Sequence, residues 1–138
     1  RFQNVEEVLN VIEPKTSIVK KEVKSTFSLQ ILDGEDYGRQ YQMQIKNIAT
    51  LGRENEFIHN DIALTETITN FISRAHATLE CIHNEVFLRD GQWDDTLKHW
   101  KHSKNGTYIN GTLVSVYTGQ KLFIDDVITV GNTSIKFS

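Results

Sequence analysis

The sequence predicts an all-β fold, a sandwich of two packed antiparallel sheets. From Thr26 onward, short segments alternate apolar and polar residues with a period of two. Turn-forming residues separate these segments at roughly the 8–12-residue spacing of sandwich proteins. The gaps between them carry no clear helical stripe. The 138 residues, 38 % of them hydrophobic, can build one core.

The first 24 residues follow a different pattern. A run over residues 4–13 has the apolar spacing i, i+3, i+4 and i+7 of an amphipathic helix, and Pro14 would end it. A helix this short is marginal in isolation, so a frayed linker explains the run equally well. Residues 15–24 are polar and basic, which is typical of a linker. We therefore expect an N-terminal helix and linker over residues 1–24, and a β-sandwich domain over residues 25–138.

The first two strands are predicted from strict alternation. Phe27, Leu29 and Ile31 point to one face of a segment that ends at the turn-forming pair Asp33 and Gly34. The same alternation returns over residues 40–45. Each strand therefore has one face for the core and one for solvent.

The remaining strands are shorter. Asn110 and Gly111 are a strong hairpin signal, while Gly131 and Asn132 are a weaker one. The long gaps at residues 54–60, 65–72 and 91–105 are predicted to be loops, which is where binding residues tend to lie. The expected strands are at residues 49–52, 61–64, 76–83, 85–90, 107–109, 113–117, 120–122, 127–130 and 134–137.

Composition limits the class of protein. Fifteen Lys and Arg against eighteen Asp and Glu give a net charge of −3, which argues against binding to nucleic acid or anionic membranes through bulk charge. Cys81 is the only cysteine, so no disulfide framework is possible, and we expect it to be a small core residue. No signal-like or membrane-length apolar run is present, so we expect an intracellular protein, cytoplasmic or nuclear, without membrane insertion. The chain begins with Arg1 rather than Met, and we expect it to be part of something longer.

Three short motifs lie at predicted strand-to-loop junctions. Gly52-Arg53 ends one strand, Ser73-Arg74-Ala75-His76 precedes another, and Asn105-Gly106 ends the longest loop. An anion site needs fixed positive charge, short hydroxyl donors and backbone amides that converge from different loops. If these strand ends meet at one edge of the sandwich, the motifs would supply all three.

The order and spacing of these motifs resemble the signature of the forkhead-associated (FHA) domain, a phosphothreonine-binding β-sandwich of the FHA/SMAD-like type. The third motif extends from Ser103 to Thr107 and is followed by Asn110-Gly111. The resemblance covers about residues 25–138. It implies a module that recognises phosphothreonine in a partner protein, for signalling or complex assembly, with no catalytic role and no cofactor.

The resemblance also assigns roles. Arg53 would pair with the phosphate, the hydroxyl and backbone amide of Ser73 would donate to it, and Arg74 would supply a second charge. Asn105 would hold the peptide backbone just after the phosphothreonine. The structural support of the site would come from Gly52, His76, Gly106 and Thr107, with His76 bracing the loop that carries the serine.

The sequence departs from the family pattern at Lys104. The family often has serine or threonine there, so an ammonium or the backbone amide would replace a hydroxyl contact. The loop over residues 91–104 is also longer than the minimal pattern. In the family, a loop residue often sets the preference for the third residue after the phosphothreonine. Asn132 lies near the expected position of that loop residue.

Each of these residues also has a purely structural interpretation. Arg53 and Arg74 could be solvated charges, Ser73 a strand-start hydroxyl, and Asn105 part of an ordinary turn. The basic run over residues 98–104 is typical of a solvated loop that could also attract an acidic or phosphorylated partner. Trp93 and Trp100, in the loop over residues 91–105, are expected to pack that loop down.

Two other functions fit parts of the sequence. A sandwich could bind partners without phosphate, through the N-terminal helix. A metal-dependent hydrolase could use nitrogen and carboxylate ligands at short spacing. No Ser-His-Asp or paired-carboxylate arrangement is favoured by spacing, so we do not expect an enzyme or a resident metal. The candidate metal ligands are Asp94, Asp95, His99 and His102.

Overall fold

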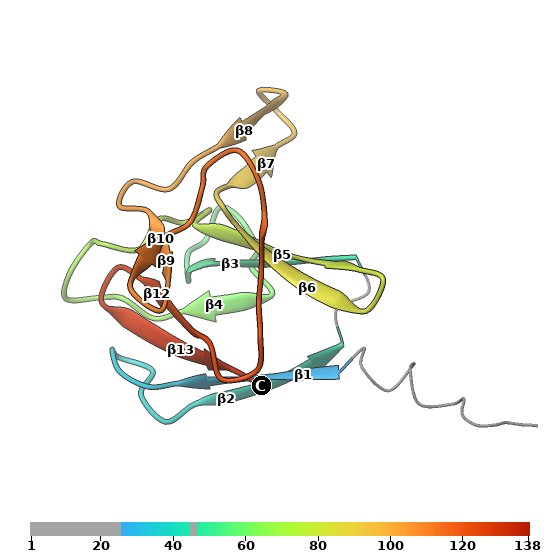
Figure 1. Ribbon diagram of the computed structural model, residues 1–138. Coiled ribbons are helices and arrows are strands. Elements are labelled where there is room, and N and C mark those ends of the chain that lie inside the picture. Colours follow the sequence, from blue (N-terminus) through green and yellow to red (C-terminus); the bar gives the residue numbers. More distant parts are fainter. Residues whose placement is uncertain (1–25, 45–46) are drawn as a thin grey trace, which may run out of the picture.

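The computed structural model describes residues 26–44 and 47–138, which form strands, turns and loops (Figure 1). The helix predicted over residues 4–13 and the boundary between residues 24 and 25 lie outside the described residues. Within the described part of the chain, no helix has the length and apolarity to cross a membrane.

One face of the sandwich is a six-stranded antiparallel sheet in the order β10-β9-β12-β13-β1-β2. Figure 1 shows β1, β2 and β13 on the side away from β5 and β6. In this sheet β1 pairs with β13, so the first and last strands of the described chain are neighbours. Its strands are β1 (Thr26–Ile31), β2 (Gln40–Gln44), β9 (Thr107–Ile109), β10 (Thr112–Leu113), β12 (Val127–Val130) and β13 (Thr133–Phe137).

The second face is a five-stranded sheet in the order β11-β6-β5-β3-β4. The β3–β4 pair is parallel, with Leu51 opposite Ile62, and so departs from the predicted antiparallel arrangement. The other pairs in this sheet are antiparallel. Its strands are β3 (Ile48–Arg53), β4 (Ile62–Leu64), β5 (Ala77–Ile82), β6 (Glu85–Asp90) and β11 (Gln120–Lys121).

The core lies between these two sheets. In β1 the residues Phe27, Leu29 and Ile31 are buried, while Thr26 and Gln30 are exposed, as the period of two predicts. Burial of one leucine or isoleucine side chain stabilises the fold by about 1.5–3 kcal/mol. The predicted all-β sandwich is therefore confirmed. The largest fully buried apolar side chains are those of Leu29, Ile31, Leu51, Ile62, Leu64, Ile72, Leu79, Leu88, Ile128 and Ile135.

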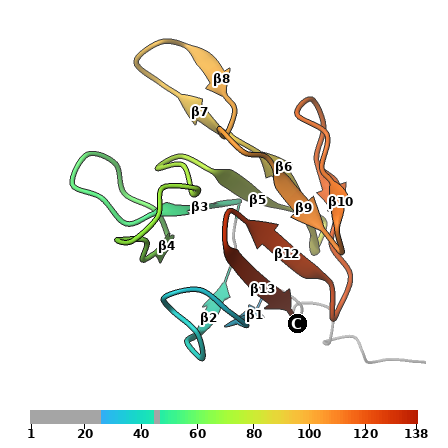
Figure 2. The same cartoon turned by 90° about the vertical axis from the view of Figure 1, so that its left-hand side faces the viewer.

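The region 91–105, predicted as a loop, instead contains a hairpin of β7 (Gln92–Asp94) and β8 (His99–Lys101). Figure 2 shows this hairpin projecting beyond the two large sheets. Trp93 pairs with Trp100, and most of the hairpin is exposed. Because the hairpin does not bury one face in the core, it lacks the alternation that marks the other strands. The strand predicted over residues 113–117 is also wrong in its bounds, because the observed strand ends at Leu113.

Candidate anion-binding site

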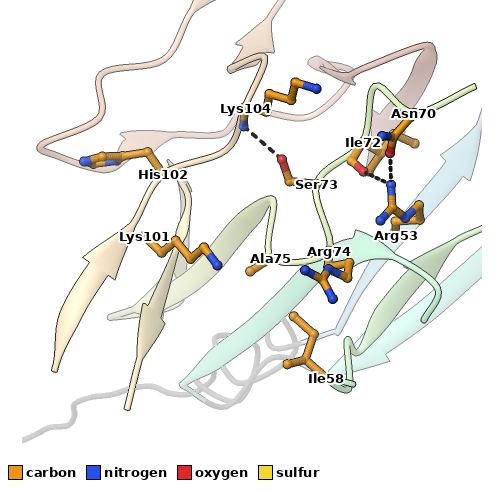
Figure 3. A pocket seen from close by; sticks show the side chains of 10 residues that line it. All are labelled: Arg53, Ile58, Asn70, Ile72, Ser73, Arg74, Ala75, Lys101, His102 and Lys104. Carbon is orange, nitrogen blue, oxygen red and sulfur yellow. Dashed lines mark hydrogen bonds between the residues drawn. The ribbon is translucent and has the colours of Figure 1, made fainter. Parts of the chain in front are cut away.

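A cleft forms where three segments meet at one end of the sandwich: the end of β3, the loop before β5, and the residues around the end of β8 (Figure 3). Hydrogen bonds join them. The Arg53 amide donates to the Ser73 carbonyl at 3.0 Å, and the Lys104 amide donates to the Ser73 hydroxyl oxygen at 2.9 Å. The cleft is lined by Arg53, Ile58, Asn70, Ile72, Ser73, Arg74, Ala75, Lys101, His102 and Lys104.

Four of the predicted ligand residues line this cleft together. They come from three separate parts of the chain, and nothing in the sequence required that these parts meet. The fifth, Asn105, follows Lys104 directly but is not among the lining residues. The four are Arg53, Ser73, Arg74 and Lys104.

Gly52 allows the loop before β5 to approach β3. A Cβ atom at this position would lie 2.1 Å from the Arg74 carbonyl oxygen and 2.8 Å from Nδ2 of Asn60. That amide in turn donates to the same carbonyl at 2.7 Å. Asn60 is itself held by Nε2 of buried Gln92, at 2.9 Å. Arg53 and Ser73 can therefore be neighbours because residue 52 has no side chain.

The Arg53 guanidinium is half-buried and held from one side. Its Nη1 donates to the carbonyl of Ile72 at 3.2 Å and to Oδ1 of Asn70 (Figure 3). Within residues 26–44 and 47–138, Nε and Nη2 make no hydrogen bond, and a guanidinium has five N–H donors. The group is thus oriented by neutral acceptors and keeps donors for an anion.

Ser73 is bonded on three of its polar atoms. Its carbonyl accepts from Arg53, its hydroxyl oxygen accepts from Lys104, and its amide donates to Nδ1 of His76 at 2.9 Å. The amide therefore already has an acceptor inside the protein. The hydroxyl hydrogen is left to donate, and the bond from Lys104 fixes the position of its oxygen.

His76 is fully buried and joins two loops of the site. Because Nδ1 accepts from the Ser73 amide, the ring hydrogen lies on Nε2, which donates to the Gly106 carbonyl at 2.8 Å. Burial lowers the pKa of His76 below its ordinary value, although the Gly106 bond and the charges of Asp90 and Glu66 act in the opposite direction. A neutral imidazole is the form that fits both bonds.

Asp90, a buried residue at the end of β6, anchors the loop before β9. Its Oδ1 accepts from the hydroxyls of Ser103 at 2.5 Å and Thr107 at 2.7 Å, and Oδ2 accepts from the Ser103 amide at 3.1 Å. The Ser103 hydroxyl oxygen then accepts from the Gly106 amide at 2.8 Å. Asp90 was not predicted as part of the site, because an aspartate before Gly91 looks like an ordinary turn residue.

Asn105 is exposed beside the cleft. Its Nδ2 donates to the carbonyl of Phe71 at 2.9 Å, while its Oδ1 makes no hydrogen bond within the described residues. The following Gly106 has φ +85°, a left-handed conformation that favours glycine. Asn105 therefore presents a free acceptor next to Lys104.

Two residues that the sequence analysis left out of the site, Lys101 and His102, also line the cleft. The basic run over residues 98–104 is the feature of the sequence that could have indicated these two residues. That run divides, because Lys98 points elsewhere and pairs with Asp95 at 3.0 Å.

Arg74 and Lys104 reach the cleft in different ways. The Arg74 guanidinium lies over the Phe57 ring, 5.2 Å from its centroid. Lys104 uses its amide to hold Ser73, so its ammonium is the group left for a ligand. Both side chains are exposed.

The carboxylate of Glu66 shapes the loop next to Arg53. It accepts from the Thr69 hydroxyl at 2.5 Å and from the amides of Phe71 and Ile72, both at 2.8 Å. Burial raises the pKa of Glu66, but these bonds together outweigh burial and leave the pKa below its ordinary value. An ionised Glu66 therefore holds the loop that orients Arg53.

Asn132 lies against the same loop but outside the cleft. Its Nδ2 donates to Oγ1 of Thr69 at 3.2 Å. A Cβ atom at Gly131 would lie 2.8 Å from the Ile72 side chain, so the last hairpin packs tightly there. The hydrogen bond and this packing place Asn132 beside Thr69.

The candidate metal ligands do not form a site. Asp94 accepts from the amides of Thr96 and Leu97, at 2.9 and 3.0 Å, which also lowers its pKa. Among residues 26–44 and 47–138, no three His, Cys, Asp or Glu side chains are placed to hold a metal ion. The structure thus gives the hydrolase alternative no metal centre in this part of the chain.

Comparison with known proteins places this geometry in a family. A structure from a study of phosphothreonine-dependent FHA domain interactions is 26 % identical, with a TM-score of 0.59, over 81 % of this chain and 94 % of the other. The FhaA FHA domain in complex with the intracellular domain of Rv3910 is also 26 % identical, with a TM-score of 0.59, over 81 % of this chain and 99 % of the other.

An FHA domain from Arabidopsis thaliana shares the fold at 24 % identity and a TM-score of 0.68, over 90 % of this chain and 93 % of the other. No curated protein matches the sequence. The family model of the FHA domain matches residues 49–131, which include Arg53, Ser73 and Asn105. The chain belongs to the FHA domain family.

Proposed function

We propose that this domain binds a phosphothreonine-containing segment of a partner protein in the cleft at the end of β3. The observation that carries the proposal is that Arg53, the Ser73 hydroxyl and Lys104 line one cleft, with no carboxylate among its lining residues. The binding unit we propose is the domain over residues 25–138. The family is one of interaction modules, and we propose no catalytic step.

The available donors suit a phosphate monoester. Phosphothreonine carries a charge of about −1.5 to −2 at neutral pH and three acceptor oxygens. Arg53 offers Nε and Nη2, Ser73 offers its hydroxyl hydrogen, and Lys104 offers its ammonium. Hydrogen bonds between charged partners are roughly twice as strong as neutral ones. Plain threonine offers these donors nothing comparable.

The surrounding bonds hold these donors in position before a ligand arrives. His76 ties the Ser73 loop to Gly106, and Asp90 ties the residues around Ser103 to β6. Such preorganisation raises affinity because less freedom is lost on binding. We propose Gly52, His76, Gly106 and Thr107 as this structural support.

Asn105 and Asn132 would contact the chain that follows the phosphothreonine. The free Oδ1 of Asn105 can accept a hydrogen bond from a peptide amide. Its Nδ2 can donate to a peptide carbonyl in place of the Phe71 carbonyl. Asn132 lies farther along, beyond Thr69, and is our candidate for selecting a later residue. The phosphothreonine-dependent FHA interactions and the FhaA complex support this function for relatives at 26 % identity.

A phosphopeptide library tests the proposal. We expect peptides with phosphothreonine to bind, with binding lost after phosphatase treatment and weakened when phosphoserine replaces phosphothreonine. Arg53→Ala should abolish binding, while the matched control Arg39→Ala, which removes an exposed arginine paired with Asp36, should not. Equal binding of phosphorylated and plain peptides would reject the proposal. Unchanged partner binding by the Arg53→Ala protein would favour phosphate-independent interaction instead.

A further inference from the structure

The cleft holds more positive charge than one phosphate needs. Its lining includes four side chains with permanent positive charge and neither Asp nor Glu, although the whole chain has a net charge of −3. A phosphothreonine neutralises at most two of these charges. Two cations are therefore left without an anionic partner in the cleft. The four cations are those of Arg53, Arg74, Lys101 and Lys104.

The four cations fall into two groups. Figure 3 shows Arg53 and Lys104 on the side of Ser73 that faces Asn70, whereas Lys101 and Arg74 point toward the region around Ala75 from two different segments. The second pair comes from β8 and from the loop before β5. The cleft thus presents cations on two sides of Ser73.

The second pair is not committed to carboxylates of the protein. Arg74 is steadied by the neutral ring of Phe57. Lys101 lies near Asp94 and helps to lower its pKa, but the hydrogen bonds to that carboxylate come from the amides of Thr96 and Leu97. Both cations are exposed and can reach a ligand without breaking an ion pair.

We propose that Arg74 and Lys101 form a second anion subsite, which binds an acidic or phosphorylated side chain that precedes the phosphothreonine. This inference rests on the proposed function. There, Asn105 holds the residues after the phosphothreonine, and its side chain bonds to Phe71, which precedes Ser73 in the chain, whereas Ala75 follows Ser73. The residues before the phosphothreonine then pass Arg74 and Lys101. An extended peptide advances about 3.3 Å per residue, so a residue two positions before the phosphothreonine lies about 6.6 Å along the peptide from it.

Four peptides separate the possibilities in fluorescence anisotropy titrations in one buffer. The reference peptide carries phosphothreonine between alanines. The other three add glutamate two residues before it, phosphoserine two residues before it, or glutamate two residues after it. We expect the preceding glutamate to tighten binding about 5-fold, as for an exposed ion pair, and phosphoserine to tighten it more. The glutamate placed after the phosphothreonine should give less than half of the gain in affinity that the preceding glutamate gives.

Two variants and a control assign the gain to the subsite. In Lys101→Gln and in Arg74→Gln, the ratio between reference and preceding-glutamate affinities should fall from about 5 to about 2, because each variant removes one of the two cations. Lys98→Gln, on the same hairpin but paired with Asp95, should keep the ratio. A gain that stays undiminished in Lys101→Gln, or equal gains from glutamate before and after, would overturn the subsite. Failure of the reference peptide itself to bind would instead reject the proposed function.

Discussion

The carbonyl oxygen of Arg74 occupies the space where a side chain of residue 52 would begin. A Cβ atom on Gly52 would lie 2.1 Å from that oxygen, far inside van der Waals contact. The contact sets the distance between β3 and the loop before β5. It therefore places Arg53 and Ser73 around the same cleft, although 19 residues of sequence lie between them.

Gly52→Ala should push the loop before β5 away from β3. Overpacking of a tight site costs about 1–3 kcal/mol of unfolding free energy, and affinity for a phosphothreonine peptide should fall as well. Urea unfolding and peptide titration measure the two effects. Gly119→Ala is the control, since its Cβ would come closest to the Phe87 side chain, at 3.2 Å, with the nearest backbone atom, the Leu88 oxygen, at 3.9 Å and without positive φ. Equal effects of the two substitutions would show that the Arg74 contact is not decisive.

His76 should make the stability of the free domain depend on pH. Its pKa is lower in the folded protein than the unfolded value of about 6.5. Below that pH the unfolded chain binds more protons than the folded one, so stability is full above pH 6.5 and declines as the pH falls toward the folded pKa. Urea unfolding without ligand between about pH 5 and 8 measures this decline.

His76→Gln should flatten that pH dependence and also lower stability at neutral pH, because the buried bonds to Ser73 and Gly106 are disturbed. His99→Gln, at an exposed position on β8, should leave the slope as it is in the parent protein. A slope that is the same in all three proteins would mean that His76 does not titrate as the structure implies.

Asp90→Asn should weaken both the fold and the site. The substitution removes the charge and replaces one acceptor oxygen by an NH2 donor, which would face either the Ser103 amide or the two hydroxyls. Loss of hydrogen bonds to a charged group costs about 1.5–3 kcal/mol each. Affinity for the phosphopeptide should also fall, although Asp90 does not line the cleft, and titration measures this. Asp125→Asn, at an exposed carboxylate paired with Lys136, is the control. Unchanged affinity in Asp90→Asn would show that the Ser103 loop keeps its position without the carboxylate.

The sequence predicted the strands that bury one face, because burial imposes the period of two. It failed for the β7–β8 hairpin, whose Trp93 is 55 % exposed, since nothing there forces apolar residues onto one side. The motif around Ser73 could be located on different grounds. A serine or glycine at a strand end is by itself an ordinary turn residue, but three such motifs in one order and spacing match a family signature.

The supporting carboxylates could not be predicted. Asp90 and Glu66 become recognisable only through the donors that surround them, and these donors come from loops whose approach is a tertiary property. The same holds for Lys101 in the cleft and Lys98 outside it. The two lysines lie in one basic run, and only the hairpin geometry separates them.

Lys104→Ser tests how an ammonium replaces the hydroxyl that the family often has at this position. The backbone bond from residue 104 to Ser73 does not depend on the side chain, so the cleft should keep its shape. Removal of one cation should weaken phosphothreonine binding about 3- to 10-fold at low salt, as expected for a charge-assisted contact. The difference should shrink at about 0.5 M salt, where exposed charges are screened. Titrations of the parent, Lys104→Ser and the control Lys98→Ser at both salt concentrations measure this. A loss of the same size at both concentrations would indicate that Lys104 acts on the shape of the loop rather than through its charge.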